Sequence, residues 1–262
     1  MLRVFLKKLL SVLGYNLVNT KLSEDSDDPF LVISRIFKSE SIRTIIDGGA
    51  SIGETSLRFL TLFPESKVYM FEPYSGFKQY LEEKESLYSN LIYEPCALSN
   101  CQSYKLLQIN ESKGTNSILH GDSNGKEIYG SQFKNVGEEK IKCITLDLWF
   151  NDKEINTIDI LKLDVQGTEI DVLEGAKNLF SKNMIRSLIV EINFQECYED
   201  QKSWVHLVNN LTNSRFHLFN LYNPYFYSGR LVQADAIFIH DLVLKSLNLR
   251  SEFHDYSKYL RK

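Results

Sequence analysis

A glycine-rich turn with a carboxylate on each side is the feature of this 262-residue sequence most able to do chemistry. Residues 44–46 are apolar or β-branched and lead to Asp47, and three glycines follow within residues 48–53. A second apolar stretch, residues 67–71, leads to Glu72, which lies 25 positions after Asp47. Glycine lets the backbone approach a ligand closely, and a carboxylate at a strand end can accept two hydrogen bonds from a ribose diol. The pattern therefore predicts a nucleotide-binding crevice.

The glycine spacing and the local charge indicate which nucleotide fits. A dinucleotide turn has the pattern G-x-G-x-x-G, which Gly48, Gly49 and Gly53 do not give. Asp47 and Glu54 also bring negative charge to a turn that would have to hold a pyrophosphate. S-adenosyl-L-methionine (SAM) carries a cationic sulfonium and tolerates these charges. The residues thus favour SAM, and an NAD-type dehydrogenase is the less favoured alternative.

Two further carboxylates, Asp164 and Glu191, are the candidate catalytic residues. Asp164 ends the apolar stretch 158–163, which places it at a strand end beside the expected cofactor. Its alternative role is a structural cap on the following helix. Glu191 lies inside the apolar strand 187–192, where an unpaired charge is costly, so it either faces the crevice or has a buried partner. Glu169 is expected to support the start of the next helix through the helix dipole.

Apolar strands alternate with amphipathic helices, which predicts an α/β fold. We expect a Rossmann-like, doubly wound and mostly parallel seven-stranded sheet, with N-terminal helices and a closing antiparallel hairpin. The hairpin is predicted from residues 216–222 and 234–240, joined by an aromatic loop at 222–230 in which Tyr225 and Tyr227 could stack on an acceptor. Ligands in such sheets bind beyond the carboxyl ends of the strands.

Two other segments carry specific expectations. Residues 75–86 are predicted to form a helix with Ser75 as its N-cap. Residues 110–139 are rich in Gly, Ser and Asn and weakly periodic, which favours a long functional loop.

Composition indicates which partners and which cellular compartment to expect. The formal net charge of −4 gives no footprint for nucleic acid. The four cysteines form no CxxC pair and no zinc-like cluster, so no metal site is expected and a reducing, cytoplasmic location is inferred. No stretch has the roughly 20 apolar residues that a membrane span requires.

The N-terminus has its own pattern. Leucines and one phenylalanine recur at helical spacing across residues 2–13. This stripe predicts a helix that packs on the main domain or on a second subunit of a homo-oligomer, and a peripheral membrane contact is the open alternative.

Four segments together resemble the FkbM-type class I SAM-dependent methyltransferases. They are residues 46–53 (Ile-Asp-Gly-Gly-Ala-Ser-Ile-Gly), 69–73 (Tyr-Met-Phe-Glu-Pro), 144–147 (Ile-Thr-Leu-Asp) and 159–170 (Asp-Ile-Leu-Lys-Leu-Asp-Val-Gln-Gly-Thr-Glu-Ile). The first two occur across class I methyltransferases, and the combination of the last two is specific to this family. The resemblance implies a methyltransferase domain at residues 41–245, after a helical extension (1–40) and before a C-terminal tail (246–262).

The resemblance also implies roles for individual residues. It assigns the methionine end of SAM to Gly49, Ala50, Ser51 and Gly53, with Asp47 beneath this turn. It assigns the ribose to Glu72, with Pro73 shaping the end of the strand, and the adenine to the backbone of Ala97. It places Asn116 and Ser117 in a loop that closes on the cofactor, and Asp164 near the sulfonium and the acceptor. The family usually has Glu where this chain has Gln166, so an acid/base role at that position is in doubt.

The resemblance implies SAM-dependent O-methylation of a hydroxyl on a glycan or a secondary metabolite. The partner is then a small-molecule or glycan acceptor. The alternative is a domain that binds SAM or a nucleotide without catalysis and serves as an interaction module.

Overall fold

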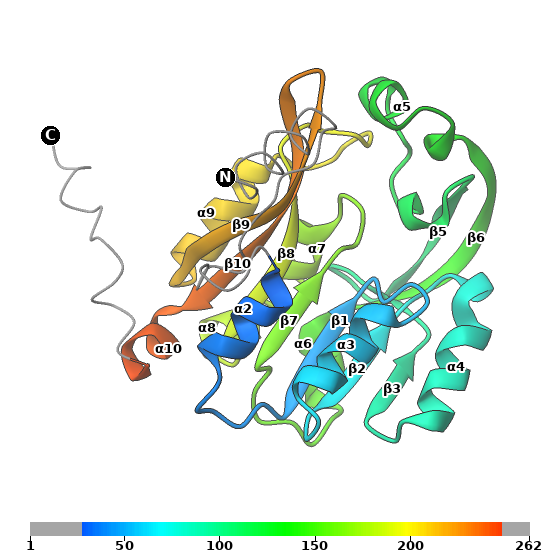
Figure 1. Cartoon of the computed structure of the whole chain (residues 1–262). Coiled ribbons are helices and arrows are strands. Elements are labelled where there is room, and N and C mark those ends of the chain that lie inside the picture. Colours follow the sequence, from blue (N-terminus) through cyan, green and yellow to red (C-terminus); the bar gives the residue numbers. More distant parts are fainter. Residues whose placement is uncertain (1–27, 248–262) are drawn as a thin grey trace, which may run out of the picture.

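The structure, a computed structural model, describes residues 28–247 and is built on one seven-stranded sheet (Figure 1). The strand order is β3-β2-β1-β7-β8-β10-β9. β3, β2, β1, β7 and β8 run parallel to one another, and β10 pairs antiparallel with both β8 and β9. The predicted fold class is confirmed. The strands are β1 (Thr44–Gly48), β2 (Lys67–Phe71), β3 (Leu91–Glu94), β7 (Ile160–Leu163), β8 (Ser187–Asn193), β9 (Phe216–Tyr227) and β10 (Arg230–His240).

Helices cover both faces of this sheet because successive strand residues point to opposite sides. Ile45 and Ile160 contribute to one buried cluster, whereas their neighbours Ile46 and Leu161 contribute to the other. The first cluster is covered by α2 (Pro29–Ile36), α3 (Glu54–Leu62), α4 (Lys78–Leu87) and α10 (Asp241–Ser246). The second is covered by α6 (Leu146–Asn151), α7 (Glu169–Glu174), α8 (Lys177–Ser181) and α9 (Trp204–Asn213).

A second, three-stranded sheet lies beside the main one and was not expected from the sequence (Figure 1). Its order is β4-β6-β5, formed by β4 (Ala97–Leu98), β5 (Ser103–Asn110) and β6 (Asn135–Ile144). The apolar stretch 91–98 is thus divided between the two sheets, with β3 in the main sheet and β4 in the second. Ala97 begins β4 and does not lie at the end of a strand of the main sheet.

The segment predicted as a long loop, residues 110–139, is largely structured. It contains the short helices η2 (Lys113–Thr115), α5 (Ser123–Tyr129) and η3 (Gly130–Phe133), followed by the first half of β6. Asp122 caps α5 by accepting a hydrogen bond from the Gly125 N–H at 2.6 Å. These elements are too short to give a clear sequence period, and they are stabilised by packing of Ile128 and Phe133 against Tyr198 and Val232.

Two local expectations were wrong. Ser75 does not cap α4, because its hydroxyl donates to Glu139 Oε2 at 2.9 Å and the helix follows a 3₁₀ turn, η1 (Ser75–Phe77). The aromatic residues 222–227 do not form a loop. They extend β9 to a tight turn at Ser228 and Gly229, both with positive φ, which matches the twist of a two-residue hairpin.

The apolar stripe at residues 2–13 and most of the C-terminal tail lie outside the described residues. The predicted division into three parts remains a prediction. α2, which belongs to the proposed extension, buries Ile33 in the main core, and Phe37 directly after it is also buried there. Within residues 28–247, no helix is both long and apolar enough to cross a bilayer.

Candidate functional site

A cavity of about 230 Å³ opens at the carboxyl ends of β1, β2 and β7. Most of the residues proposed for SAM line it, although they come from distant parts of the chain. Those lining it are Gly49, Ser51, Glu72, Pro73, Ala97, Asn116, Ser117 and Asp164. Asp47, Ala50, Gly53 and Glu191 do not line it. A second cavity of about 400 Å³ lies between α8 and α9, away from the strand ends.

The glycine turn is held between β2 and β7. The N–H groups of Gly49 and Ala50 both donate to the Phe71 carbonyl at 3.0 Å. Gly49 has φ +77°, and a Cβ on it would lie 1.9 Å from the carbonyl oxygen of Asp164. Only glycine fits there, because both the conformation and the close backbone packing exclude a side chain.

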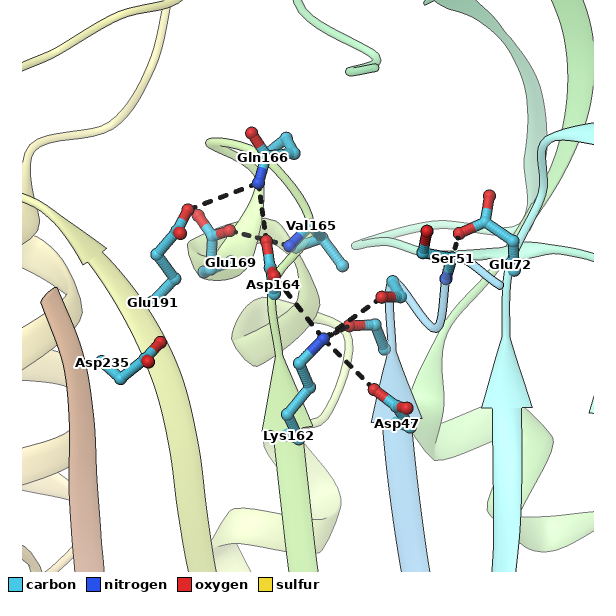
Figure 2. Close-up of polar contacts among 12 residues, drawn as sticks. Asp47, Ser51, Glu72, Lys162, Asp164, Val165, Gln166, Glu169, Glu191 and Asp235 are labelled. Atoms are coloured by element: carbon cyan, nitrogen blue, oxygen red, sulfur yellow. Dashed lines mark hydrogen bonds and ion pairs between the residues drawn. The ribbon is translucent and has the colours of Figure 1, made fainter. Parts of the chain in front are cut away.

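Glu72 joins the end of β2 to this turn (Figure 2). Its Oε2 accepts from the Ser51 N–H and its Oε1 from the Tyr74 N–H, each at 2.9 Å. Burial raises the pKa of Glu72 to about 7, opposed by these two hydrogen bonds. Each carboxylate oxygen has a second lone pair, and the residue lines the cavity, so Glu72 retains acceptor capacity for a ligand.

A buried lysine, Lys162, organises the floor of the crevice, and the sequence analysis missed it. Its Nζ lies 3.2 Å from Asp47 Oδ1, 3.2 Å from the Gly49 carbonyl oxygen and 3.7 Å from Asp164 Oδ2 (Figure 2). Asp47 is fully buried and also accepts from the Ser56 hydroxyl at 2.5 Å. Burial lowers the pKa of Lys162, but the nearby carboxylates outweigh it and raise the pKa above its ordinary value. The available signal was a lysine within an apolar strand, which requires a charged partner.

Asp164 and Glu191 are brought together by Gln166 (Figure 2). The Gln166 amide donates to Asp164 Oδ1 at 2.6 Å and to Glu191 Oε2 at 3.4 Å. The Asp164 side chain is 40% exposed, whereas Glu191 is 9% exposed. Glu191 Oε1 accepts from the Gln233 amide at 2.8 Å. Burial first, and then the nearby charge of Asp164, raise the pKa of Glu191 well above its ordinary value. Of the two candidate catalytic groups, Asp164 is the one with access to the cavity.

Glu169 stabilises the turn between β7 and α7 through direct hydrogen bonds. Its Oε1 accepts from the Val165 N–H at 3.0 Å and from the Gly167 N–H at 3.3 Å. Burial raises the pKa of Glu169 to about 7. The side chain thus holds the turn before α7, and support of the helix through its dipole remains a prediction.

The segment around Asn116 and Ser117 closes one side of the cavity. Ser117 Oγ donates to the Gln166 carbonyl at 2.6 Å, and Asn116 Oδ1 accepts from the Asn110 N–H at 2.9 Å. Asn116 Nδ2 is buried and has no protein acceptor. A buried donor without a partner is costly, so this amide, at the wall of the cavity, fits a ligand that supplies an acceptor. SAM has such acceptors in its adenine, ribose and carboxylate.

The two aromatic residues singled out from the sequence, Tyr225 and Tyr227, lie on β9. Tyr225 stacks on Tyr129 of α5 with ring centroids 5.8 Å apart, and the Tyr129 hydroxyl donates to Gln233. His120 is exposed and lines a different cavity. Among the described residues, no cluster of His, Cys, Asp or Glu could hold a metal ion.

Comparison with known proteins identifies relatives of the chain. The 2-O-methyltransferase NoeI of Sinorhizobium fredii is 26% identical over 177 residues, which cover 65% of this chain and 70% of that protein. The methyltransferase sdnD of Sordaria araneosa is 27% identical over 170 residues, covering 56% of this chain and 65% of that protein.

A solved structure agrees with the fold. The crystal structure of methyltransferase FkbM from Methylobacillus flagellatus KT aligns with a TM-score of 0.50 at 16% identity, covering 76% of this chain and 44% of that chain. A family model, the methyltransferase FkbM domain, matches residues 47–218, which is more than half of the chain. This protein therefore belongs to the FkbM methyltransferase family, and SAM is its cofactor.

Proposed function

We propose that this methyltransferase transfers the methyl group of SAM to a hydroxyl oxygen of a glycan or of another small molecule. The observation that carries the proposal is the position of Asp164, a half-exposed carboxylate at the edge of the cavity beside the glycine turn. The relative whose name states a 2-O-methyltransferase supports oxygen as the acceptor atom.

The proposed placement of SAM follows the residues that line the cavity. Glu72 accepts hydrogen bonds from the ribose diol with the lone pairs that Ser51 and Tyr74 leave open. The Asn116 amide donates to a ligand acceptor, and Ala97 lies beside the adenine. Gly49 and Ser51 lie along the methionine end. Asp47, Ala50 and Gly53 hold the turn from behind and do not touch the ligand.

The proposed chemistry divides between cofactor and protein. When bound, SAM supplies a carbon that its sulfonium already activates for displacement. The protein orients the acceptor hydroxyl in line with that carbon, at about 3–3.5 Å. Asp164 takes the hydroxyl proton as the oxygen–carbon bond forms, and the sulfur–carbon bond breaks to leave neutral S-adenosylhomocysteine (SAH). Lys162 keeps Asp164 oriented through an ion pair below the crevice.

The acceptor is proposed to enter between the cavity and the hairpin. Tyr129 and Tyr225 offer aromatic surface there, and flat faces of sugars or rings pack on such surface.

We propose a cytoplasmic location, supported by the four free thiols at Cys96, Cys101, Cys143 and Cys197. A contact of residues 2–13 with a membrane or a second subunit remains a prediction.

Two measurements test the proposal. Calorimetry with SAM is expected to give saturable binding, and no binding to folded protein at millimolar SAM would contradict it. Incubation with SAM and a pool of cell-derived glycans and metabolites is expected to release SAH. Binding without any release would instead favour the non-catalytic interaction module.

A further inference from the structure

Gln166 lies where four separate segments of the chain meet. Its backbone carbonyl accepts from Ser117 Oγ at 2.6 Å. Its side-chain oxygen accepts from the Tyr198 hydroxyl at 2.8 Å. Its amide nitrogen donates to Asp164 and Glu191 (Figure 2). The residue has φ +53°, a conformation that costs free energy for a side chain other than glycine. The surrounding contacts hold it in this strained position.

The chemistry of an amide explains why Gln suits this position. An amide group has two N–H donors and an oxygen acceptor. Here one donor points to each carboxylate, and the oxygen faces a hydroxyl donor, so the amide orientation is fixed by its partners. A carboxyl group at position 166 would have at most one donor when protonated and none when ionised. It would then place a third carboxylate between Asp164 and Glu191.

The geometry is also unequal between the two carboxylates. The amide lies 2.6 Å from Asp164 but 3.4 Å from Glu191. Lys162 lies 3.7 Å from Asp164, whereas no ion pair reaches Glu191 within the described residues. Hydrogen bonds and cations near a carboxylate favour its charged form. Gln166 and Lys162 therefore act mainly on Asp164, whereas the shortest hydrogen bond to Glu191 comes from the Gln233 amide at 2.8 Å.

We propose that Gln166 is a positioning residue that holds the Asp164 carboxylate aimed at the crevice, and that it does so by donating to Asp164 from an amide that Glu191 and Tyr198 keep in place. This inference rests on the proposed function, in which Asp164 lies beside the sulfonium and the acceptor. It assigns to Gln166 a task that needs no base at that position.

Other charged groups lie around Asp164 and Glu191. Asp47 and Lys162 lie below, Glu169 lies on α7, and Asp235 on β10 is paired in register with Glu191. Tyr198 and Tyr129 lie on the side of α5 and remain neutral, since burial raises the pKa of both hydroxyls. A test must therefore separate Asp164 from these neighbours.

The ratio of SAH to SAM dissociation constants provides that test without a known acceptor. The two ligands differ by the sulfonium charge and its methyl group. Protonation of Glu72 therefore changes both dissociation constants alike and cancels in their ratio. The ratio is measured by calorimetry from about pH 5 to about pH 7, where the amino and carboxylate ends keep one charge state. In the unaltered protein the ratio is expected to stay constant. In Gln166→Met it is expected to be about threefold or more lower at each pH, because the Asp164 carboxylate is no longer held toward the sulfonium.

Matched variants make the result specific. Asp164→Asn alone and the double variant Asp164→Asn with Gln166→Met are expected to give the same ratio, since no carboxylate is left there for Gln166 to hold. Gln102→Met, an exposed substitution outside the crevice, is expected to behave as the unaltered protein. Gln166→Ala serves as the second variant if the methionine form does not fold, with thermal melting as the check.

The outcomes separate the two proposals. A ratio equal to that of the unaltered protein in folded Gln166→Met and Gln166→Ala would overturn the positioning role while leaving the methyltransferase assignment intact. A lower ratio in the double variant than in Asp164→Asn would also overturn it, because a group other than Asp164 would be responsible. Failure of the unaltered protein to bind either ligand would refute the proposed function and this inference with it.

Discussion

The backbone N–H of Ser51 donates a 2.9 Å hydrogen bond to Oε2 of Glu72, and this contact ties the glycine turn after β1 to the end of β2. Ser51 has φ +51°, so the turn exposes its amide toward the neighbouring strand. The same carboxylate holds Tyr74 and lines the cavity. Glu72 thus holds the turn and lines the cavity, so replacing it tests its role in ligand binding directly.

Replacing Glu72 with alanine is expected to weaken SAM binding by about 1–3 kcal/mol, because charge-assisted hydrogen bonds to the ribose are lost. Calorimetry measures the change. Glu139→Ala is the matched control, since Glu139 bonds to nearby Ser75 but does not line the cavity. Equal affinities of the Glu72 variant and the unaltered protein would refute the ribose role.

The raised pKa of Glu72, about 7, predicts that SAM and SAH both bind more weakly as the pH falls. The ribose hydroxyls donate to the ionised carboxylate, so binding competes with its protonation. Affinity is therefore expected to decline as the pH falls from about 7 to about 5, where the amino end of both ligands keeps one charge state. In Glu72→Ala this decline should be absent, and its persistence there would assign the response to another group.

Replacing Lys162 with methionine is expected to destabilise the fold by about 3–5 kcal/mol, because fully buried Asp47 loses its cation. Urea unfolding measures the loss. Adding Asp47→Asn to this variant is expected to recover much of the stability, since the amide oxygen can still accept from Ser56. A double variant no more stable than Lys162→Met would mean that the ion pair is not the cause.

Gly49 and Gly130 provide a matched test of the turn, because both have positive φ but differ in surroundings. A Cβ at Gly49 would lie 1.9 Å from a backbone oxygen, whereas one at Gly130 meets nothing within 4 Å. Gly130→Ala is expected to cost about 1–3 kcal/mol from conformation alone, because its φ of 58° with ψ of −128° suits glycine. Gly49→Ala should cost clearly more and abolish SAM binding. Similar losses for both variants in thermal melts would show that the close packing at Gly49 is unimportant.

Glu169 makes a pH-dependent contribution to stability. Its pKa rises from 4.5 to about 7 on folding because it is buried. The folded state then holds a proton that the unfolded state has released, so this contribution is lost as the pH rises from about 4.5 to about 7. Glu169→Gln keeps an oxygen for Val165 and Gly167 and removes the titration.

In Glu169→Gln, the free energy of unfolding is accordingly expected to vary less between pH 5 and pH 8 than in the unaltered protein. Denaturant titrations at several pH values give the comparison. Glu199→Gln, at an exposed position, should leave the pH profile unchanged. A profile that stays as steep in Glu169→Gln as in the control would contradict this assignment.

Local pattern was sufficient for the framework of the fold. Strand 44–48 and the start of α3 at Glu54 could be read directly, because the apolar run, the glycines and the helix period all lie within about twenty residues. The cavity residues Gly49, Ser51, Glu72 and Pro73 follow from the same local signals. The second sheet could not be predicted, since β4 pairs with β6 more than forty residues later and its two-residue strand has no period of its own.

The sequence by itself determined the crevice: a parallel α/β sheet, a glycine turn and an acidic strand end that suit SAM. Only the tertiary structure decided how the charges around it are arranged. Lys162, Gln166 and Gln233 carry no local signal for their partners, because a buried hydrogen bond depends on which strands become neighbours. Asp164 and Glu191, 27 positions apart, share one amide only because β7 and β8 pair in parallel with Leu163 opposite Val190, so that the next residue on each strand lies side by side. Side-chain chemistry can be read from sequence, but protonation and orientation are set by burial and by contacts that form on folding.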